Sequence, residues 1–179
     1  MNILDLIQKN LWAMKQDKLE AVYQVAWDRM FNAKTDLSQY ETRIQNRRQD
    51  TRYLYKDGNI AVISMNGVLA KRMNMFMAVS GGTSTELLIR DFREAQEDSE
   101  IQGILLDVDS PGGTVDGTEA LANLIYESRG GKPIVAFVNG LMASAAYWIG
   151  SAADAVMIEE TGEAGSIGVY QMHTDFSKA

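Results

Sequence analysis

Residues 101–117, IQGILLDVDSPGGTVDG, join an apolar run to a glycine-rich turn. The run 101–108 is typical of a buried strand, since it is short, apolar and followed at once by turn residues. In the turn, Pro111 lacks an amide donor, and Gly112 and Gly113 leave their backbone groups unobstructed by side chains. A helical pattern begins at Thr118. This succession of strand, bare turn and helix predicts a βα unit of a parallel sheet.

The same alternation extends in both directions along the chain. Thr83 and Glu86 have the spacing of a capping box at the start of a helix. Short connections between such elements require parallel strands with right-handed crossovers, and apolar runs indicate strands buried on both faces. The sequence therefore predicts an α/β fold of parallel β-α-β units. We expect strands at 59–70, 101–108, 133–138 and 155–160, and helices at 84–96, 118–129 and 144–153.

The N-terminal part has a different character. After Asp17, a possible N-cap, apolar residues recur on one helical face from Leu19 to Met30. Residues 35–58 are polar and rich in charges, which indicates further helix or a linker. We place a boundary near Lys56, with residues 1–55 as an N-terminal helical extension and linker and 56–179 as the compact domain.

Composition narrows the possible partners and location. The 179 residues are 46% hydrophobic and 23% charged, which is typical of a soluble globular protein. A formal net charge of -7 argues against nucleic acid as a partner. The chain has no cysteine and therefore no disulfide or thiolate site. Asp5 interrupts the first apolar stretch and no basic leader precedes it, so we expect no signal peptide and a cytoplasmic protein.

Residues 133–153 carry no charged side chain and are about long enough to cross a bilayer. Pro133, Asn139 and Gly140 divide the run into a β-branched piece and an alanine-rich piece. That division favours a buried strand followed by a buried helix, and we expect no membrane partner.

The second of these pieces holds the candidate nucleophile. In NGLMASAAYWIGS, Ser144 stands at the start of a helix among small residues. The helix dipole favours negative charge there, and the amide of Ala145 could complete an oxyanion hole with amides of Gly112 and Gly113. A plain N-cap serine explains the same pattern, and the two interpretations are compatible.

The motifs DSPGG, MASAAYW with its trailing SAAD, and GSIGV resemble, in this order, peptidase family S49, the signal peptide peptidase A group. More narrowly, the chain resembles the phage-type members that act as head maturation proteases. Upstream, SGGTSTELLIRDF and KLEAVYQVAWDR are similar to the corresponding parts of those proteins, so the resemblance extends from about Leu11 to the end.

The resemblance implies a ClpP/crotonase-like α/β fold, a homo-oligomer, and a serine nucleophile paired with a lysine base. By motif position the nucleophile is Ser144, and the oxyanion hole is formed by the backbone amides of Ala145, Gly112 and Gly113. It implies capsid, portal or scaffold proteins as substrates, inside an assembling prohead in the host cytoplasm. No cofactor is expected.

The sequence departs from the family pattern at the base. The family's lysine lies well downstream of the nucleophile, beyond Ala179, and Lys178 comes too early to be that residue. We expect the 179-residue chain alone to be nearly inactive, because an unactivated serine is a poor nucleophile. The missing base would come from residues beyond Ala179 or from another chain.

Three alternatives to a Ser-Lys protease stay open, namely a ClpP-like triad, a non-catalytic module and a crotonase-like enzyme. Ser144, His173 and Asp175 could form a ClpP-like triad, although a structural histidine is favoured. Asp107 and Asp109 are read as strand-end and turn-capping groups and not as metal ligands. The chain could also be a non-catalytic capsid-assembly or scaffold-binding module, or a crotonase-like acyl-CoA enzyme. The Met73–Met77 loop is a candidate wall for substrate.

Overall fold

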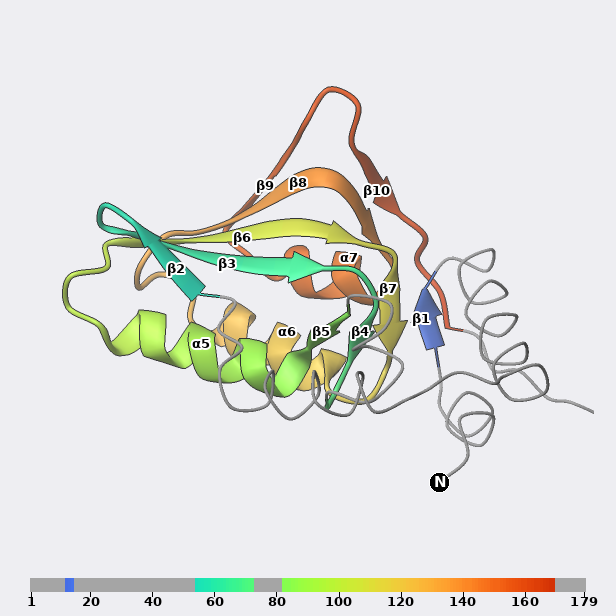
Figure 1. Cartoon of the computed structure of the whole chain (residues 1–179), viewed down its shortest axis with the longest axis horizontal. Coiled ribbons are helices and arrows are strands. Elements are labelled where there is room, and N and C mark those ends of the chain that lie inside the picture. The colour runs from blue at the N-terminus through green and yellow to red at the C-terminus, as the bar shows by residue number, and fades with distance from the viewer. Residues whose placement is uncertain (1–11, 15–53, 73–81, 170–179) are drawn as a thin grey trace, which may run out of the picture.

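The computed structural model describes residues 12–14, 54–72 and 82–169. Its main sheet has the strand order β10-β8-β6-β3-β2, and β9 pairs with β8 beside β10 (Figure 1). All pairings are parallel except that of β2 with β3. The strands are β2 (Leu54–Asp57), β3 (Ile60–Asn66), β6 (Gly103–Ser110), β8 (Ile134–Ala143), β9 (Ala155–Ile158) and β10 (Glu163–Gly165).

Helices α5 (Thr85–Glu97), α6 (Thr118–Glu127) and α7 (Ala145–Gly150) lie on one face of this sheet (Figure 1). The core lies between them, and its largest fully buried side chains include Phe92, Ile125 and Ile149. The predicted alternation of strands and helices is confirmed. Each predicted segment contains an element of the predicted type, with shifts of a few residues at the ends.

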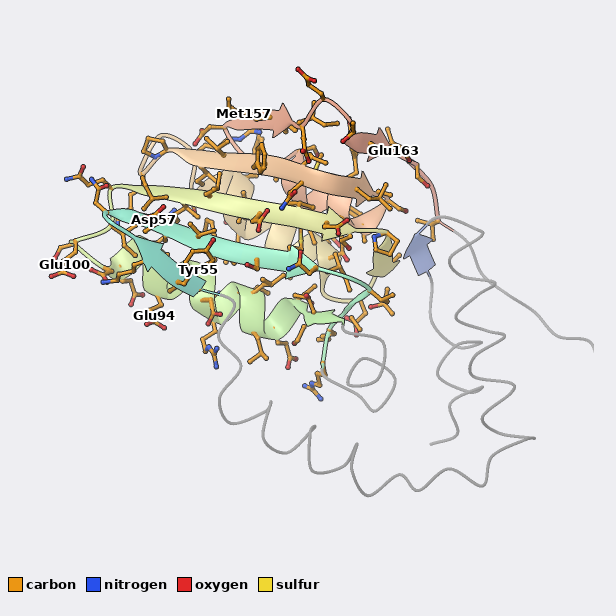
Figure 2. The ribbon with its side chains drawn as sticks, turned by 45° about the horizontal axis from the view of Figure 1, so that its top comes forward. Tyr55, Asp57, Glu94, Glu100, Met157 and Glu163 are labelled. Atoms are coloured by element: carbon orange, nitrogen blue, oxygen red, sulfur yellow. The ribbon has the colours of Figure 1, made fainter. Side chains whose placement is uncertain are left out.

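Burial on both faces was predicted for the strands and holds only in the middle of β3, where Ala61, Val62 and Ile63 are all buried. In β6, Ile104 and Leu106 are buried against the helices, whereas Leu105 and Asp107 on the other face are only half-buried. The outer strand β9 is exposed along its whole length, and Met157 stands at the edge of the sheet (Figure 2). The helices cover one face only, so apolar runs in these strands reflect one covered face and one half-shielded face.

A second, smaller sheet has the order β1-β7-β4-β5. It consists of β1 (Trp12–Met14), β7 (Gly112–Thr114), β4 (Leu69–Ala70) and β5 (Thr83–Ser84). Strand β7 is the glycine-rich turn itself, and it carries the chain from the end of β6 towards α6. Strand β4 lies inside the strand predicted at 59–70, whereas β1, β5 and β7 were not predicted, because two or three residues are too few to show a period.

The cap of α5 differs by one residue from the predicted capping box. Ser84 is the N-cap, and its side chain accepts a hydrogen bond from the Leu87 amide at 3.4 Å. Thr83 lies in β5, where its hydroxyl donates to the Asn66 carbonyl at 2.6 Å. The hydroxyl of Thr83 is thus used to join β5 to the end of β3, which leaves Ser84 to cap the helix.

Residues 133–153 contain a strand and a helix, β8 and α7, as predicted, but the division between them is wrong. Asn139 and Gly140 lie inside β8, which continues to Ala143. Among the residues that the structure describes, no helix is long and apolar enough to cross a membrane. Residues 54–57 form β2, so the end of the segment 35–58, predicted to be helix or linker, is a strand that begins two residues before the boundary at Lys56. The predicted N-terminal helix, the linker up to residue 53 and the Met73–Met77 loop lie outside the described residues.

Candidate functional site at Ser144

Ser144 joins β8 to α7 in a backbone conformation that is rare for a residue with a side chain. Its φ is 56° and its ψ is -110°, and such positive φ values persist only where the surroundings fix them. Two hydrogen bonds do so here. The Ser144 amide donates to the Gly165 carbonyl at 2.9 Å, and the Ser144 carbonyl accepts from the Trp148 amide at 2.8 Å.

Small residues explain why the chain can turn so sharply at this point. Ala145 and Ala146 are fully buried, so the first turn of α7 packs directly on its neighbours. A Cβ on Gly150 would collide with the Met142 sulfur of β8, so the last turn of α7 also needs a residue without a side chain. The helix therefore packs closely against both the strand that precedes it and β7.

The Ser144 side chain is only 5% exposed and borders a hollow of about 370 Å³. Its hydroxyl donates a hydrogen bond to the Gly168 carbonyl at 3.0 Å. The walls of the hollow are mainly apolar and come from α7 and from the chain after β10. They are formed by Tyr147, Trp148, Ser151, Ile167, Gly168 and Val169.

Backbone donors lie on both sides of this turn. Ala145 is the first residue of α7, and helix geometry leaves its amide without an intrahelical acceptor. Strand β7 contacts α7, but the Gly112 amide donates to the Ser110 hydroxyl at 3.1 Å. Gly113 packs so tightly that an added Cβ would collide with the Leu69 carbonyl oxygen. The structure thus brings the predicted elements together and shows that the Gly112 amide already has a partner.

Ser110 is the residue that sequence reasoning missed. It is fully buried, and its hydroxyl donates to the Gly67 carbonyl at 2.6 Å while accepting from Gly112. This hydroxyl holds the end of β6 to the loop that precedes β4. Its position two residues after the buried Val108 was the available signal, because alternation along β6 places both on the covered face.

No lysine in the described part of the chain reaches Ser144. Lys71 pairs with Asp116 at 3.0 Å, and Lys132 donates to the Ala95 carbonyl at 2.8 Å. Lys56 pairs with Asp98 at 2.7 Å. The hydrogen bond to Asp98 raises the pKa of Lys56, and the same bond lowers the pKa of Asp98. Each of these ammonium groups is therefore engaged away from the candidate nucleophile.

Asp109 has a structural contact that differs from the predicted turn cap. It lies in β6 and accepts the amide of Leu141 in β8 at 3.1 Å, so it joins the two strands where their register shifts. Within residues 54–72 and 82–169, no three acidic, histidine or cysteine side chains are grouped to hold a metal. His173, Asp175 and Lys178 lie outside the described residues.

Comparison with known proteins identifies the relationship. The family described as "Peptidase family S49" matches residues 127–179, a segment that contains β8, Ser144 and β10. The C-terminal part of the chain is thus similar to peptidase family S49. The matched segment includes Ser144 and Ala145, whereas Gly112 and Gly113 lie upstream of it.

Two curated relatives of this chain come from phages. The "Head-tail preconnector protein GP5" of Enterobacteria phage P21 is 36% identical over 118 residues, which are 66% of this chain and 24% of the relative. The "Capsid assembly protease C" of Escherichia phage lambda is 36% identical over 132 residues, which are 74% of this chain and 30% of the relative. The chain thus spans under a third of the length of these relatives.

A cellular protease and a solved structure are also similar to this chain. "Protease 4" of Salmonella typhi is 31% identical over 148 residues, 82% of this chain and 22% of the relative. An enoyl-CoA hydratase/isomerase family member of known structure superimposes with a TM-score of 0.50 at 14% identity, over 63% of this chain and 49% of that one. That similarity shows the fold, and the predicted ClpP/crotonase-like α/β class is confirmed.

Proposed function

We propose that this chain is part of a serine endopeptidase that cleaves proteins of an assembling phage head, with Ser144 as the nucleophile. The observation that carries this proposal is the buried Ser144 hydroxyl at a backbone turn with positive φ, inside the family-matched segment and beside an apolar hollow. Capsid, portal or scaffold proteins are the proposed substrates, because two relatives are named as a capsid assembly protease and a head-tail preconnector.

In the proposed reaction, the Ser144 oxygen attacks the carbonyl carbon of the scissile peptide bond and its proton passes to a general base. The tetrahedral intermediate places negative charge on the former carbonyl oxygen. The Ala145 amide at the start of α7 is the first donor proposed for that oxygen, and an amide of the β7 pair Gly112 and Gly113 is the second. To act as that donor, the Gly112 amide would have to leave the Ser110 hydroxyl, to which it donates at 3.1 Å. Collapse expels the amine, which takes the proton, and water then hydrolyses the acyl-enzyme.

The proposed base is a lysine outside residues 1–179 or on another copy of the chain. The three lysines of the described part support this, since each is engaged with other partners away from Ser144. A lysine can act as a base near neutral pH when burial lowers its pKa. A Ser-Lys dyad whose lysine comes from another copy of the chain would require a homo-oligomer. The proposed location of this assembly is the cytoplasm of the host cell.

The test compares the 179-residue chain with a version that continues past Ala179, each as wild type and as Ser144→Ala. Intact mass is followed over hours, with and without a candidate scaffold protein. We expect cleavage only by the longer wild-type chain, and replacing each downstream lysine by methionine should identify one that is essential.

Two results would change the proposal. Cleavage by the 179-residue chain that disappears in Ser144→Ala would place the base within residues 1–179 and reopen the interpretation with His173. If no version cleaves itself or the scaffold protein, while scaffold still binds, the chain is a non-catalytic assembly module on the same fold.

A further inference from the structure

The segment Gly165–Val169, here called the strap, closes over the candidate nucleophile. It follows β10, which pairs in parallel with the end of β8 from Leu141 to Ala143. Two carbonyl groups of the strap accept hydrogen bonds from Ser144. The Gly165 carbonyl accepts the Ser144 amide at 2.9 Å, and the Gly168 carbonyl accepts the hydroxyl at 3.0 Å.

We infer that the strap is an autoinhibitory latch, which holds Ser144 in an unreactive state until Ile167–Val169 move away. This inference rests on the proposed role of Ser144. The hydroxyl proton is directed at the Gly168 carbonyl oxygen, which accepts a hydrogen bond but is far too weak a base to remove the proton. With 5% of the residue exposed, a scissile carbonyl cannot reach the oxygen while the strap is in place.

The strap is held by few contacts beyond these two hydrogen bonds. Ile167 is 83% exposed and Val169 is 52% exposed, although both border the hollow next to Ser144. An added Cβ on either Gly165 or Gly168 would meet no atom within 4 Å, so the strap is not tightly packed at these positions. Segments with little buried apolar surface open at low free-energy cost.

Two backbone φ angles locate the hinge of the strap. Gly165 has a φ of 146° and the next residue, Ser166, has a φ of 56°. Two consecutive residues with positive φ occur just where the paired strand β10 ends and the exposed part of the strap begins. Rotation at these residues would lift Ile167–Val169 from Ser144 while β10 stays paired with β8. The same movement would open the hollow between the strap and Trp148.

The absence of cysteine from the chain provides a direct test. The variant Ser144→Cys carries one thiol, and its rate of alkylation by iodoacetamide measures how often position 144 is uncovered. Alkylation requires neither a general base nor peptidase activity, so this test can fail or succeed independently of the proposed function. The single-cysteine variant Ile167→Cys supplies the rate for an exposed thiol on the same strap.

Two alanine substitutions at strap glycines form a matched pair in the Ser144→Cys background. Gly165→Ala forces a side chain into a positive φ, whereas Gly168→Ala adds the same methyl group in open space without that strain. We expect the thiol at position 144 to react about 100-fold more slowly than the thiol at position 167. Gly165→Ala should raise the rate at position 144 about 10-fold or more, and Gly168→Ala should leave it unchanged. Equal rates at the two thiol positions, or no difference between the two glycine variants, would overturn the latch.

Discussion

Two buried serines stand at the ends of the neighbouring strands β6 and β8, and their hydroxyl groups have different hydrogen-bond partners. Ser110, at the end of β6, donates to the Gly67 carbonyl and accepts the Gly112 amide, so both of its partners belong to the tightly packed turn region around β7. Ser144, just after β8, donates to a single carbonyl on an exposed segment. Burial alone therefore does not separate a structural serine from a candidate nucleophile. The hydrogen-bond partners of the hydroxyl group separate the two.

The two turns that hold these serines differ in the same way. The turn after β6 packs backbone against backbone, since β7 lies between β1 and β4. The turn after β8 ends in the short helix α7 and is covered by the strap, which is loosely packed. Substitutions in the first turn should therefore alter stability, and those in the second should alter reactivity.

The largest effect on stability is expected for Gly113→Ala. The new Cβ would collide with the carbonyl oxygen of Leu69, and neither backbone can move without breaking the small sheet. We expect a loss of at least about 3 kcal/mol in the free energy of unfolding, measured with urea. Gly168→Ala is the control, with a change within about 0.5 kcal/mol. A Gly113→Ala protein of wild-type stability would show that the turn is loosely packed.

Ser110→Ala is expected to have the next largest effect. The substitution leaves the half-buried Gly67 carbonyl and the buried Gly112 amide without this partner. Unsatisfied buried groups cost roughly 1–3 kcal/mol, and the urea midpoint should fall accordingly. Ser110→Thr retains the hydroxyl but adds a methyl group, so a similar loss in both variants would assign the effect to packing and not to hydrogen bonds.

Ser144→Ala should change stability less than Ser110→Ala. Only one hydrogen bond is lost, and its acceptor, Gly168, is exposed and can bond to water. We expect a loss below about 1 kcal/mol in the same urea experiment. A loss as large as that of Ser110→Ala would mean that both serines have the same structural role.

The smallest effect is expected at a site remote from both serines. Lys56→Gln removes the ion pair with Asp98 on the surface, and surface pairs contribute little. The raised pKa of Lys56 means that its contribution is present below pH 10.5 and is lost as the pH rises through the folded pKa. The lowered pKa of Asp98 means that its contribution is present above pH 3.8 and is lost as the pH falls through the folded pKa.

The melting temperatures of wild type and Lys56→Gln should therefore differ slightly at neutral pH and converge at both extremes. A thermal-melt series across pH measures this difference. A gap that stays constant from acid to alkaline pH would show that the ion pair is not its cause.

The sequence predicted the parallel order of β3, β6, β8 and β9 because each of these strands coincides with an apolar run bounded by turn residues, whereas β2 and β10 were not predicted. It also predicted the position of Ser144 at the start of α7, since a small-residue helix follows an apolar strand there. It could not predict the role of Ser110 or the strap, because each depends on contacts between residues far apart in the chain. The capping residue was misplaced by one for the same reason, since Thr83 is held by Asn66.

The most direct test of the account is the cleavage rate of Ser110→Ala and Ser144→Ala, measured side by side in the longer chain and corrected for the folded fraction. Per folded molecule, Ser110→Ala should keep a cleavage rate within about 10-fold of wild type, because Ser110 contacts only the Gly112 amide of the proposed oxyanion hole. Ser144→Ala should remain folded and lose cleavage by about 10³-fold or more. A folded Ser144→Ala protein that still cleaves at the wild-type rate would contradict the assignment of Ser144 as the nucleophile.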